Sequence, residues 1–149
     1  MLVLLLGLAI ALADQVVKYL VRFRFHLGES IPVIPGFFSL TYVRNTGAAW
    51  GLFDGSNLAL AVFSFVALAG LTLFRRHFLG TSRLQQIALG LMAGGILGNL
   101  FDRVRLGYVV DFLHFYWRSW HFPSFNIADA AICTGVAVYL IVGFRSESA

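Results

Sequence analysis

Residues 125–144 read FNIADAAICTGVAVYLIVGF, and this stretch decides what kind of protein the chain forms. It is about 20 residues long, which is the length that a helix needs to cross the hydrocarbon core of a membrane. Its first turns nevertheless contain Asn126 and Asp129, which are three positions apart and share one face of a helix. An ionised aspartate in hydrocarbon costs about 2.5 kcal/mol or more, so Asp129 is a candidate functional residue.

The composition of the whole chain is that of a membrane protein. Hydrophobic residues make up 59% of the 149 residues, charged residues only 12%, and the mean hydropathy is +0.82. A soluble domain carries about 25% charged residues. We expect one domain, residues 1–149. The net charge of +4 suits anionic lipid headgroups, and no basic cluster has the aromatic spacing of an RNA-binding surface, so we expect no nucleic-acid partner.

Three further apolar stretches have about the length of a membrane span, at residues 2–22, 57–74 and 84–101. The first of them resembles a cleavable leader, because it is wholly apolar up to Ala13. However, no basic residue precedes Lys18, and the apolar pattern resumes after Asp14. We therefore interpret it as a helix that stays in the membrane.

The span at residues 84–101 carries two patterns of its own. Gly90, Gly94 and Gly98 recur at intervals of four, which lets membrane helices pack closely. At its end, Asn99 and Asp102 are three positions apart and share one helix face.

The two longer connections, residues 23–56 and 104–124, are expected at one surface of the membrane. Residues 37–43 are rich in strand-forming side chains, and residues 44–47 are typical of a turn. The second connection is dense in aromatic residues, which suits a membrane interface. The expected fold is an all-α membrane protein with four transmembrane helices, a small interfacial β segment and a second extramembrane excursion.

This arrangement brings polar residues together at one end of the helices. Spans one and three approach that end with their C-termini, and span four leaves it with its N-terminus. Six of the seven acidic residues lie there, and only Glu147 lies at the other end. The residues expected to meet are Asp14, Lys18, Asn45, Asn99, Asp102, Asp111, Asn126 and Asp129. A bundle without a site has no need of this convergence.

Asp111 and Asp129 suggest a specific chemistry. Two carboxyl groups that share a site do not both ionise readily, so one keeps a proton while the other stays charged. An aspartic protease activates water in this way, and we adopt this hypothesis. Asn45, Asn99 and Asn126 carry amide groups that suit an oxyanion or a bound peptide. For Asn99 and Asn126, hydrogen bonds between helices are an equally good interpretation.

Two charged pairs are expected to support the site. Asp14 and Lys18 are four positions apart on one helix face and can form an ion pair. Asp102 and Arg103 are expected to form a structural pair rather than to take part in catalysis.

The charges leave the orientation in the membrane open. The connection at residues 75–83 has three arginines and no acid, which favours the cytoplasm. The opposite end carries seven of the eleven basic residues, which argues against that orientation. We give more weight to residues 75–83 and place them in the cytoplasm, because their charges are dense and not balanced by acids.

Other functions fit the sequence less well. The four histidines form no His-Glu-x-x-His motif, so we expect no metal site and no cofactor. A Ser–Lys protease would need an activated serine beside Lys18, the only lysine, and none is evident. A small transporter or proton channel also places acids in a helix bundle, but internal repeats or broken helices would be expected. A pure assembly factor would tolerate the loss of either candidate aspartate.

Five blocks, in order along the chain, resemble the lipoprotein signal peptidase (signal peptidase II) family of bacterial aspartyl proteases. They are Asp14-Gln-Val-Val-Lys18, Asn45-Thr-Gly-Ala-Ala-Trp50-Gly, Gly94-Gly-Ile-Leu-Gly98-Asn99-Leu-Phe-Asp102-Arg103, Val110-Asp111-Phe112 and Phe125-Asn126-Ile-Ala-Asp129. Trp50 stands where this family usually has Phe. Five ordered blocks over nearly the whole chain form a specific signal.

The resemblance implies that Asp111 and Asp129 are the catalytic pair, at the outer leaflet of the bacterial inner membrane, with both chain termini in the cytoplasm. The implied substrate is a prolipoprotein with a diacylglyceryl group on its lipobox Cys, cut just before that Cys. The cyclic peptide globomycin is the inhibitor expected for the family. The implied supporting residues are Asp14, Lys18, Asn45, Gly47, Asn99, Asp102, Arg103 and Asn126.

Overall fold

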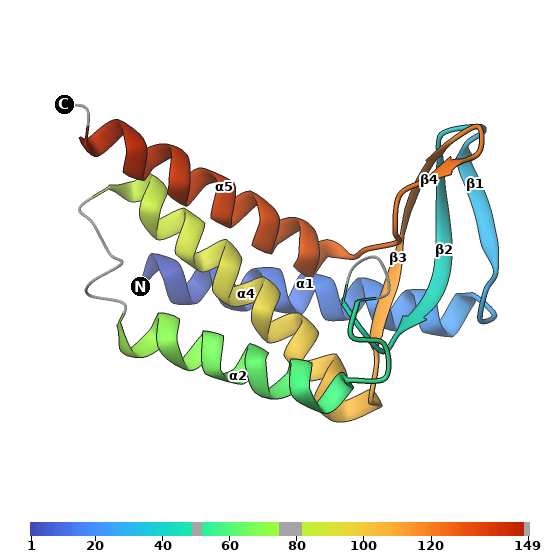
Figure 1. Ribbon diagram of the computed structural model, residues 1–149, viewed down its shortest axis with the longest axis horizontal. Coiled ribbons are helices and arrows are strands. Elements are labelled where there is room, and N and C mark those ends of the chain that lie inside the picture. The colour runs from blue at the N-terminus through green and yellow to red at the C-terminus, as the bar shows by residue number, and fades with distance from the viewer. Residues whose placement is uncertain (49–51, 75–81, 148–149) are drawn as a thin grey trace.

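The computed structural model describes residues 1–48, 52–74 and 82–147. Its helices are α1 (Leu2–Arg24), α2 (Asn57–Leu73), α4 (Arg83–Leu106) and α5 (Ile127–Glu147). Its strands are β1 (Ser30–Ile34), β2 (Phe38–Asn45), β3 (Val109–Trp117) and β4 (Trp120–His121). Figure 1 shows the helices lying side by side, with the sheet standing at one end of them.

Three of the helices are long and apolar enough to cross a membrane: Leu2–Arg24, Arg83–Leu106 and Ile127–Phe144. The fourth, Asn57–Leu73, is apolar but has 17 residues. The four-span count therefore stays a prediction. Trp50 and the arginines at 75 and 76, used above for the family motif and the orientation, lie outside the described residues.

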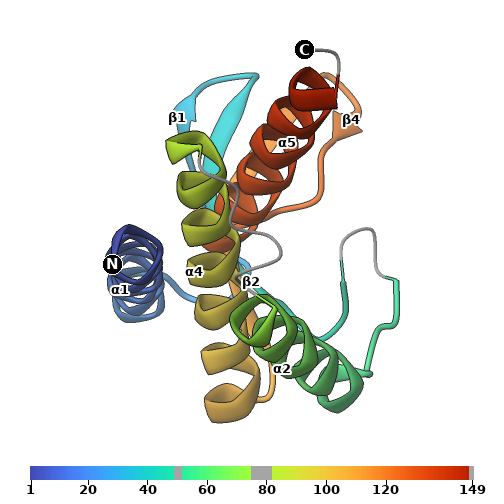
Figure 2. The ribbon, with the colours of Figure 1, turned by 90° about the vertical axis from the view of Figure 1, so that its left-hand side faces the viewer.

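The prediction that the glycine repeat brings helices together is confirmed. A Cβ atom on Gly94 would lie 2.5 Å from the carbonyl oxygen of Gly7 in α1. The neighbouring Gly95 lies against α5, where a Cβ atom would be 2.3 Å from the carbonyl oxygen of Ala128. At these two glycines the backbone of α4 thus lies directly against the backbones of α1 and α5, and α4 lies between them in Figure 2.

The predicted helices and small β segment are present, and the sheet is more extensive than the sequence indicated. The strand order is β1-β2-β3-β4, and all neighbouring strands are antiparallel. Arg44 and Asn45, expected in a turn, belong to β2 and pair with Val110 and Val109 of β3. The second excursion is therefore mainly a strand, and its pairing with β2 joins the two excursions into one unit.

A small apolar cluster fixes this sheet to the helices. Val21 of α1 packs with Tyr42 of β2 and with Val110 and Phe112 of β3, and all four are buried. Apolar burial contributes about 25 cal/mol per Å². The cluster places Asp111, between Val110 and Phe112, directly over the ends of the helices.

Candidate active site

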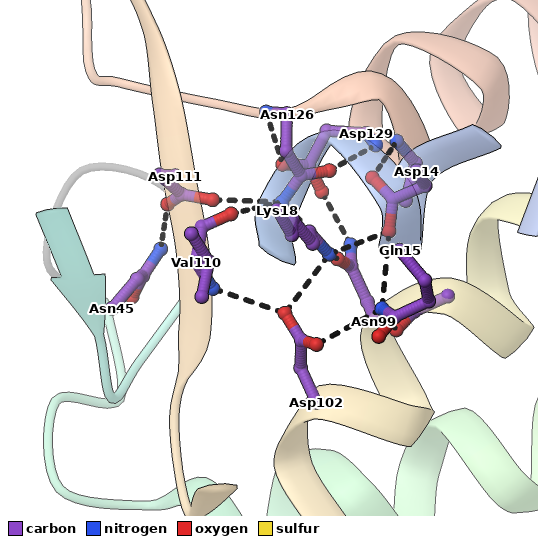
Figure 3. A network of polar contacts seen from close by, with 12 residues as sticks. Asp14, Gln15, Lys18, Asn45, Asn99, Asp102, Val110, Asp111, Asn126 and Asp129 are labelled. Atoms are coloured by element: carbon purple, nitrogen blue, oxygen red, sulfur yellow. Dashed lines mark hydrogen bonds and ion pairs between the residues drawn. The ribbon is translucent and has the colours of Figure 1, made fainter. Parts of the chain in front are cut away.

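Lys18 lies at the centre of a buried polar network at the sheet end of the helices (Figure 3). Its Nζ atom lies 2.8 Å from Asp14 Oδ2 and 3.0 Å from Asp102 Oδ2, and it donates a hydrogen bond to Asn99 Oδ1 at 2.8 Å. An ammonium group has three donors, so every one of them has a partner. The expected Asp14–Lys18 pair is confirmed.

Asp102 connects this network to the sheet. Its Oδ2 accepts a hydrogen bond from the backbone N–H of Val110 at 3.1 Å, and its Oδ1 accepts one from Gln15 Nε2 at 2.9 Å. The expectation of an Asp102–Arg103 pair was wrong, because the ion-pair partner of Asp102 is Lys18. Consecutive helical residues point in different directions, which explains the difference.

Asp14 connects the network to α5. Its Oδ1 accepts a hydrogen bond from the backbone N–H of Ala128 at 2.9 Å. The first N–H groups of a helix have no partner within the helix, and a carboxylate there is stabilising. Asp14 therefore holds the start of the helix that carries Asp129.

Asn126 bridges the two candidate catalytic aspartates. Its side-chain Nδ2 donates to Asp111 Oδ1 at 2.8 Å, and its backbone N–H donates to Asp129 Oδ2 at 3.2 Å. In return, its Oδ1 accepts from the backbone N–H of Asp129 at 2.9 Å. A second amide, Asn99 Nδ2, donates to Asp129 Oδ1 at 2.7 Å. Asn126 thus contacts both carboxyl groups and links their positions.

Asp111 is almost completely buried, with 1% of its surface exposed, whereas Asp129 is partly open. Burial of the carboxyl group, together with the nearby charge of Asp129, raises the pKa of Asp111 to about 7. Removal from water disfavours the charged form of a carboxyl group, and a second carboxylate adds to this effect. Asp111 is thereby suited to hold a proton near neutral pH.

The outer side of the pair is formed by β2 and the residues that follow it. Asn45 Nδ2 donates to Asp111 Oδ2 at 2.9 Å, and Asn45 Oδ1 accepts from the N–H of Gly47 at 2.9 Å. Arg103 reaches the carbonyl oxygen of Gly47 at 3.4 Å, and its charge interacts with both Asp111 and Asp129. A Cβ atom on Gly47 would lie 2.7 Å from the carbonyl oxygen of Leu52, so this position requires glycine.

All ten predicted site residues therefore belong to one connected region, and the sequence missed two neighbours. Gln15 donates to Asp102, and Asn57 of α2 donates to the carbonyl oxygen of Arg103 at 3.1 Å. Gln15 follows Asp14 by one position and gives no periodic signal. Asn57 opens an apolar helix, and its polar side chain there was the available clue.

The arrangement has the parts that general acid–base chemistry needs. One carboxyl group is deeply buried and favours the protonated state, and a second, more open one lies beside it. Amide donors hold both in place, and a guanidinium group is nearby.

Comparison with known proteins places this geometry in a family. The sequence profile of the family described as signal peptidase (SPase) II matches residues 6–145. The chain belongs to this family. Its members include the lipoprotein signal peptidase of Symbiobacterium thermophilum, 43% identical over 141 residues, which cover 95% of this chain and 93% of that protein. The lipoprotein signal peptidase of Geobacter sulfurreducens is 45% identical over 137 residues, covering 90% and 86%.

Two solved structures, both described as bacterial membrane enzymes obtained by the in meso method, share the fold. One has a TM-score of 0.90 at 34% identity and covers 98% of this chain and 89% of its own. The other has a TM-score of 0.84 at 35% identity and covers 94% and 90%. This signal peptidase II family member is thus a protease, and its apolar helices make it a multi-pass membrane protein.

Proposed function

We propose that this protein is an aspartic endopeptidase that removes the signal peptide from diacylglyceryl-modified prolipoproteins by cutting just before the lipidated Cys. The observation that carries the proposal is the pair Asp111 and Asp129, held by the single bridging residue Asn126. Family membership supports a lipoprotein precursor as the substrate. A substrate anchored by acyl chains also explains why the protease lies in a membrane.

In the proposed reaction, one carboxylate of the pair takes a proton from water as the water oxygen attacks the scissile carbonyl carbon. The other carboxyl group, protonated, donates its proton to the carbonyl oxygen. The leaving nitrogen then takes the proton that the first carboxylate received from water, a hydroxyl group of the tetrahedral intermediate returns its proton to the second carboxylate, and the C–N bond breaks. The resting pair therefore needs one proton between its two carboxyl groups.

Other residues hold the pair rather than react. Asn45, Asn99 and Asn126 donate to the carboxylate oxygens at 2.7–2.9 Å, which fixes their orientation. The positive charge of Arg103 is available to the developing oxyanion, since charge placed in advance stabilises a transition state strongly. Lys18 forms ion pairs with both Asp14 and Asp102, so its charge offsets part of the repulsion that these two carboxylates add around the pair.

The proposal also covers the location of the site in the membrane and its inhibition. We place the site at the outer leaflet of the bacterial inner membrane, with both chain termini in the cytoplasm. We also expect globomycin to inhibit the enzyme, as it does for the family that the chain resembles.

The function is tested by cleavage of a purified precursor in detergent. The wild-type protein is mixed with a prolipoprotein that carries the diacylglyceryl group and, separately, with the same precursor in which Ser replaces the lipobox Cys. We expect the first alone to be cut, with mass spectrometry placing the cut directly before the lipidated Cys. Absence of cleavage, together with ion flux in reconstituted vesicles, would instead support the transporter.

A further inference from the structure

A long furrow runs along α1 and α4, on the side where α2 lies. It consists of two adjoining cavities with volumes of about 460 and 660 Å³, and both are lined by Leu8 and Leu97. The larger cavity extends towards the N-terminus of α1 and is also lined by Leu68 and Leu71 of α2. Figure 2 shows α1 and α2 on opposite sides of α4, with the end nearest this cavity towards the viewer.

The furrow lies on a different face of α4 from the candidate catalytic pair. Asn99 faces Asp129, whereas Leu97, Phe101 and Arg105 line the furrow. Among the described residues, none of α5 lines either cavity. The furrow reaches the buried polar network at Gln15, Lys18 and Asp102, but neither Asp111 nor Asp129 lines it.

The lining of the furrow changes along its length. Through most of its course it is apolar, with Leu8, Leu12, Leu97 and Phe101 on its walls. At the sheet end it is lined by Arg22 and Arg105, which lie in the last turns of α1 and α4. An apolar furrow that ends at two cationic side chains suits a molecule with an apolar chain and an anionic headgroup.

Both arginines are available for such a head. Arg22 and Arg105 are exposed, and neither takes part in an ion pair within the described part of the chain. The acid nearest to them in the lining, Asp102, is buried and already paired with Lys18. Guanidinium groups bind phosphate through paired N–H donors, so two of them at one end of the furrow suit a phosphate group.

We propose that the furrow binds one anionic phospholipid, with an acyl chain along Leu8, Leu12, Leu97 and Phe101 and the phosphate between Arg22 and Arg105. A diacylglyceryl group or the apolar helix of a signal peptide carries no anion to match these two cations, so a membrane phospholipid fits better. The site lies apart from the catalytic pair, and the proposal is independent of the proposed function.

The test counts the lipids that stay bound to the protein. The protein is reconstituted in nanodiscs of equal phosphatidylglycerol and phosphatidylcholine, extracted into detergent and weighed by native mass spectrometry. We expect one phosphatidylglycerol per protein. The double variant Arg22→Gln/Arg105→Gln should lower its affinity about 30-fold, the effect of two basic side chains at an anionic headgroup.

Two controls separate this site from general surface charge. The variant Arg24→Gln/Arg118→Gln removes two exposed arginines that do not line the furrow and should retain the lipid. Leu8→Trp keeps both arginines but fills the furrow where the two cavities meet, and it should lose the lipid. It also keeps the test decisive if the double arginine variant fails to fold.

Four results would overturn the proposal. Equal retention of the two lipids would show that the headgroup charge has no effect. Equal loss in both double arginine variants would show general surface attraction. Retention by Leu8→Trp would show that no chain lies in the furrow. Displacement of the lipid by millimolar inorganic phosphate would show a site for free phosphate rather than for a phospholipid.

Discussion

At the scale of single residues, the buried charge of Lys18 is the central feature. Its side chain has 1% of its surface exposed, and its three partners come from α1 and α4. Two charges removed from water are stable only when the geometry is good and the remaining donors are satisfied. This holds for Lys18, so its role is to keep α1, α4 and the attached strand β3 in register.

Replacing Lys18 with Met should therefore be strongly destabilising. The change leaves the carboxylates of Asp14 and Asp102 buried without a counter-charge, which costs about 3–5 kcal/mol. Thermal unfolding in detergent, followed by circular dichroism, measures this. Arg24→Gln, which removes an exposed cation of the same helix, should change the stability by less than about 0.5 kcal/mol. Equal midpoints for Lys18→Met and the wild type would contradict this role.

The raised pKa of Asp111 predicts how the cleavage rate depends on pH. One member of the pair must hold a proton, and above a pKa of about 7 Asp111 loses it. The logarithm of kcat/KM should therefore fall with a slope of about −1 as the pH rises beyond neutral. A rate measured from pH 5 to pH 9 on one lipidated precursor checks this. A rate that stays constant up to pH 9 would show that no such proton is needed.

The contacts of some site residues could be predicted from the sequence, and those of others could not. Asp14 and Lys18 are four positions apart, and helix geometry alone predicts their pairing. The bridge made by Asn126 depends on where β3 lies, and no local pattern contains that information. Asn45 meets Asp111 across 66 residues, because β2 and β3 pair. Contacts of this kind become visible only when the sheet is known.

At the scale of elements, backbone contact between helices determines how closely α1, α4 and α5 pack. A Cβ atom on Gly94 would meet the backbone of Gly7 and lie 2.9 Å from the Cβ atom of Ile10. Backbone atoms cannot move aside as a flexible side chain does. The helices must separate if this position carries a side chain.

Gly94→Ala should accordingly destabilise the bundle by about 1–3 kcal/mol, the usual effect of overpacking a tight contact. Gly70→Ala is the matched control, because nothing lies within 4 Å of a Cβ atom there and alanine favours a helix interior. The thermal unfolding midpoints of Gly94→Ala and Gly70→Ala, measured in the same detergent, test this prediction. A Gly94→Ala midpoint at or above that of Gly70→Ala would be incompatible with the packing described.

The boundaries of the elements were predicted less well from the sequence than their positions. The sequence placed the end of the third span near residue 101, where charged residues begin. The helix α4 continues to Leu106 and ends at Gly107, whose φ of 79° is readily adopted by glycine. The first charged residues mark the end of the apolar stretch, but they do not mark the end of the helix. Strand β3 was missed because its aromatic residues suit a membrane interface as well as a sheet.

At the scale of the whole molecule, the sheet lies at one end of the helices, and the candidate site lies between the two (Figure 1). The prediction that the polar residues converge at one end is confirmed by the network around Lys18. The orientation of that end in the membrane stays a prediction, because the basic residues at the two ends of the helices favour opposite orientations.

We predict that the sheet end faces outward. In cells that express a Cys133→Ser background, a cysteine at Ser30 should react with a membrane-impermeant maleimide in intact spheroplasts. A cysteine at Ser82, which precedes α4 at the other end, should react only after permeabilisation. The reverse labelling pattern would invert the orientation.

Asp111 and Asp129 are the proposed catalytic pair, and the cleavage rates of variants at these two positions test that role. Cleavage of a diacylglyceryl-modified precursor is timed for the wild type, Asp111→Asn, Asp129→Asn and the matched control Glu29→Gln, an acid at the same end that lies outside the network. We expect each aspartate variant to remain folded and to lose about 10³-fold or more in rate, because acid–base groups contribute up to about 10⁴-fold. Glu29→Gln should cut like the wild type. A folded aspartate variant that cuts within about tenfold of the wild-type rate would contradict the aspartic mechanism.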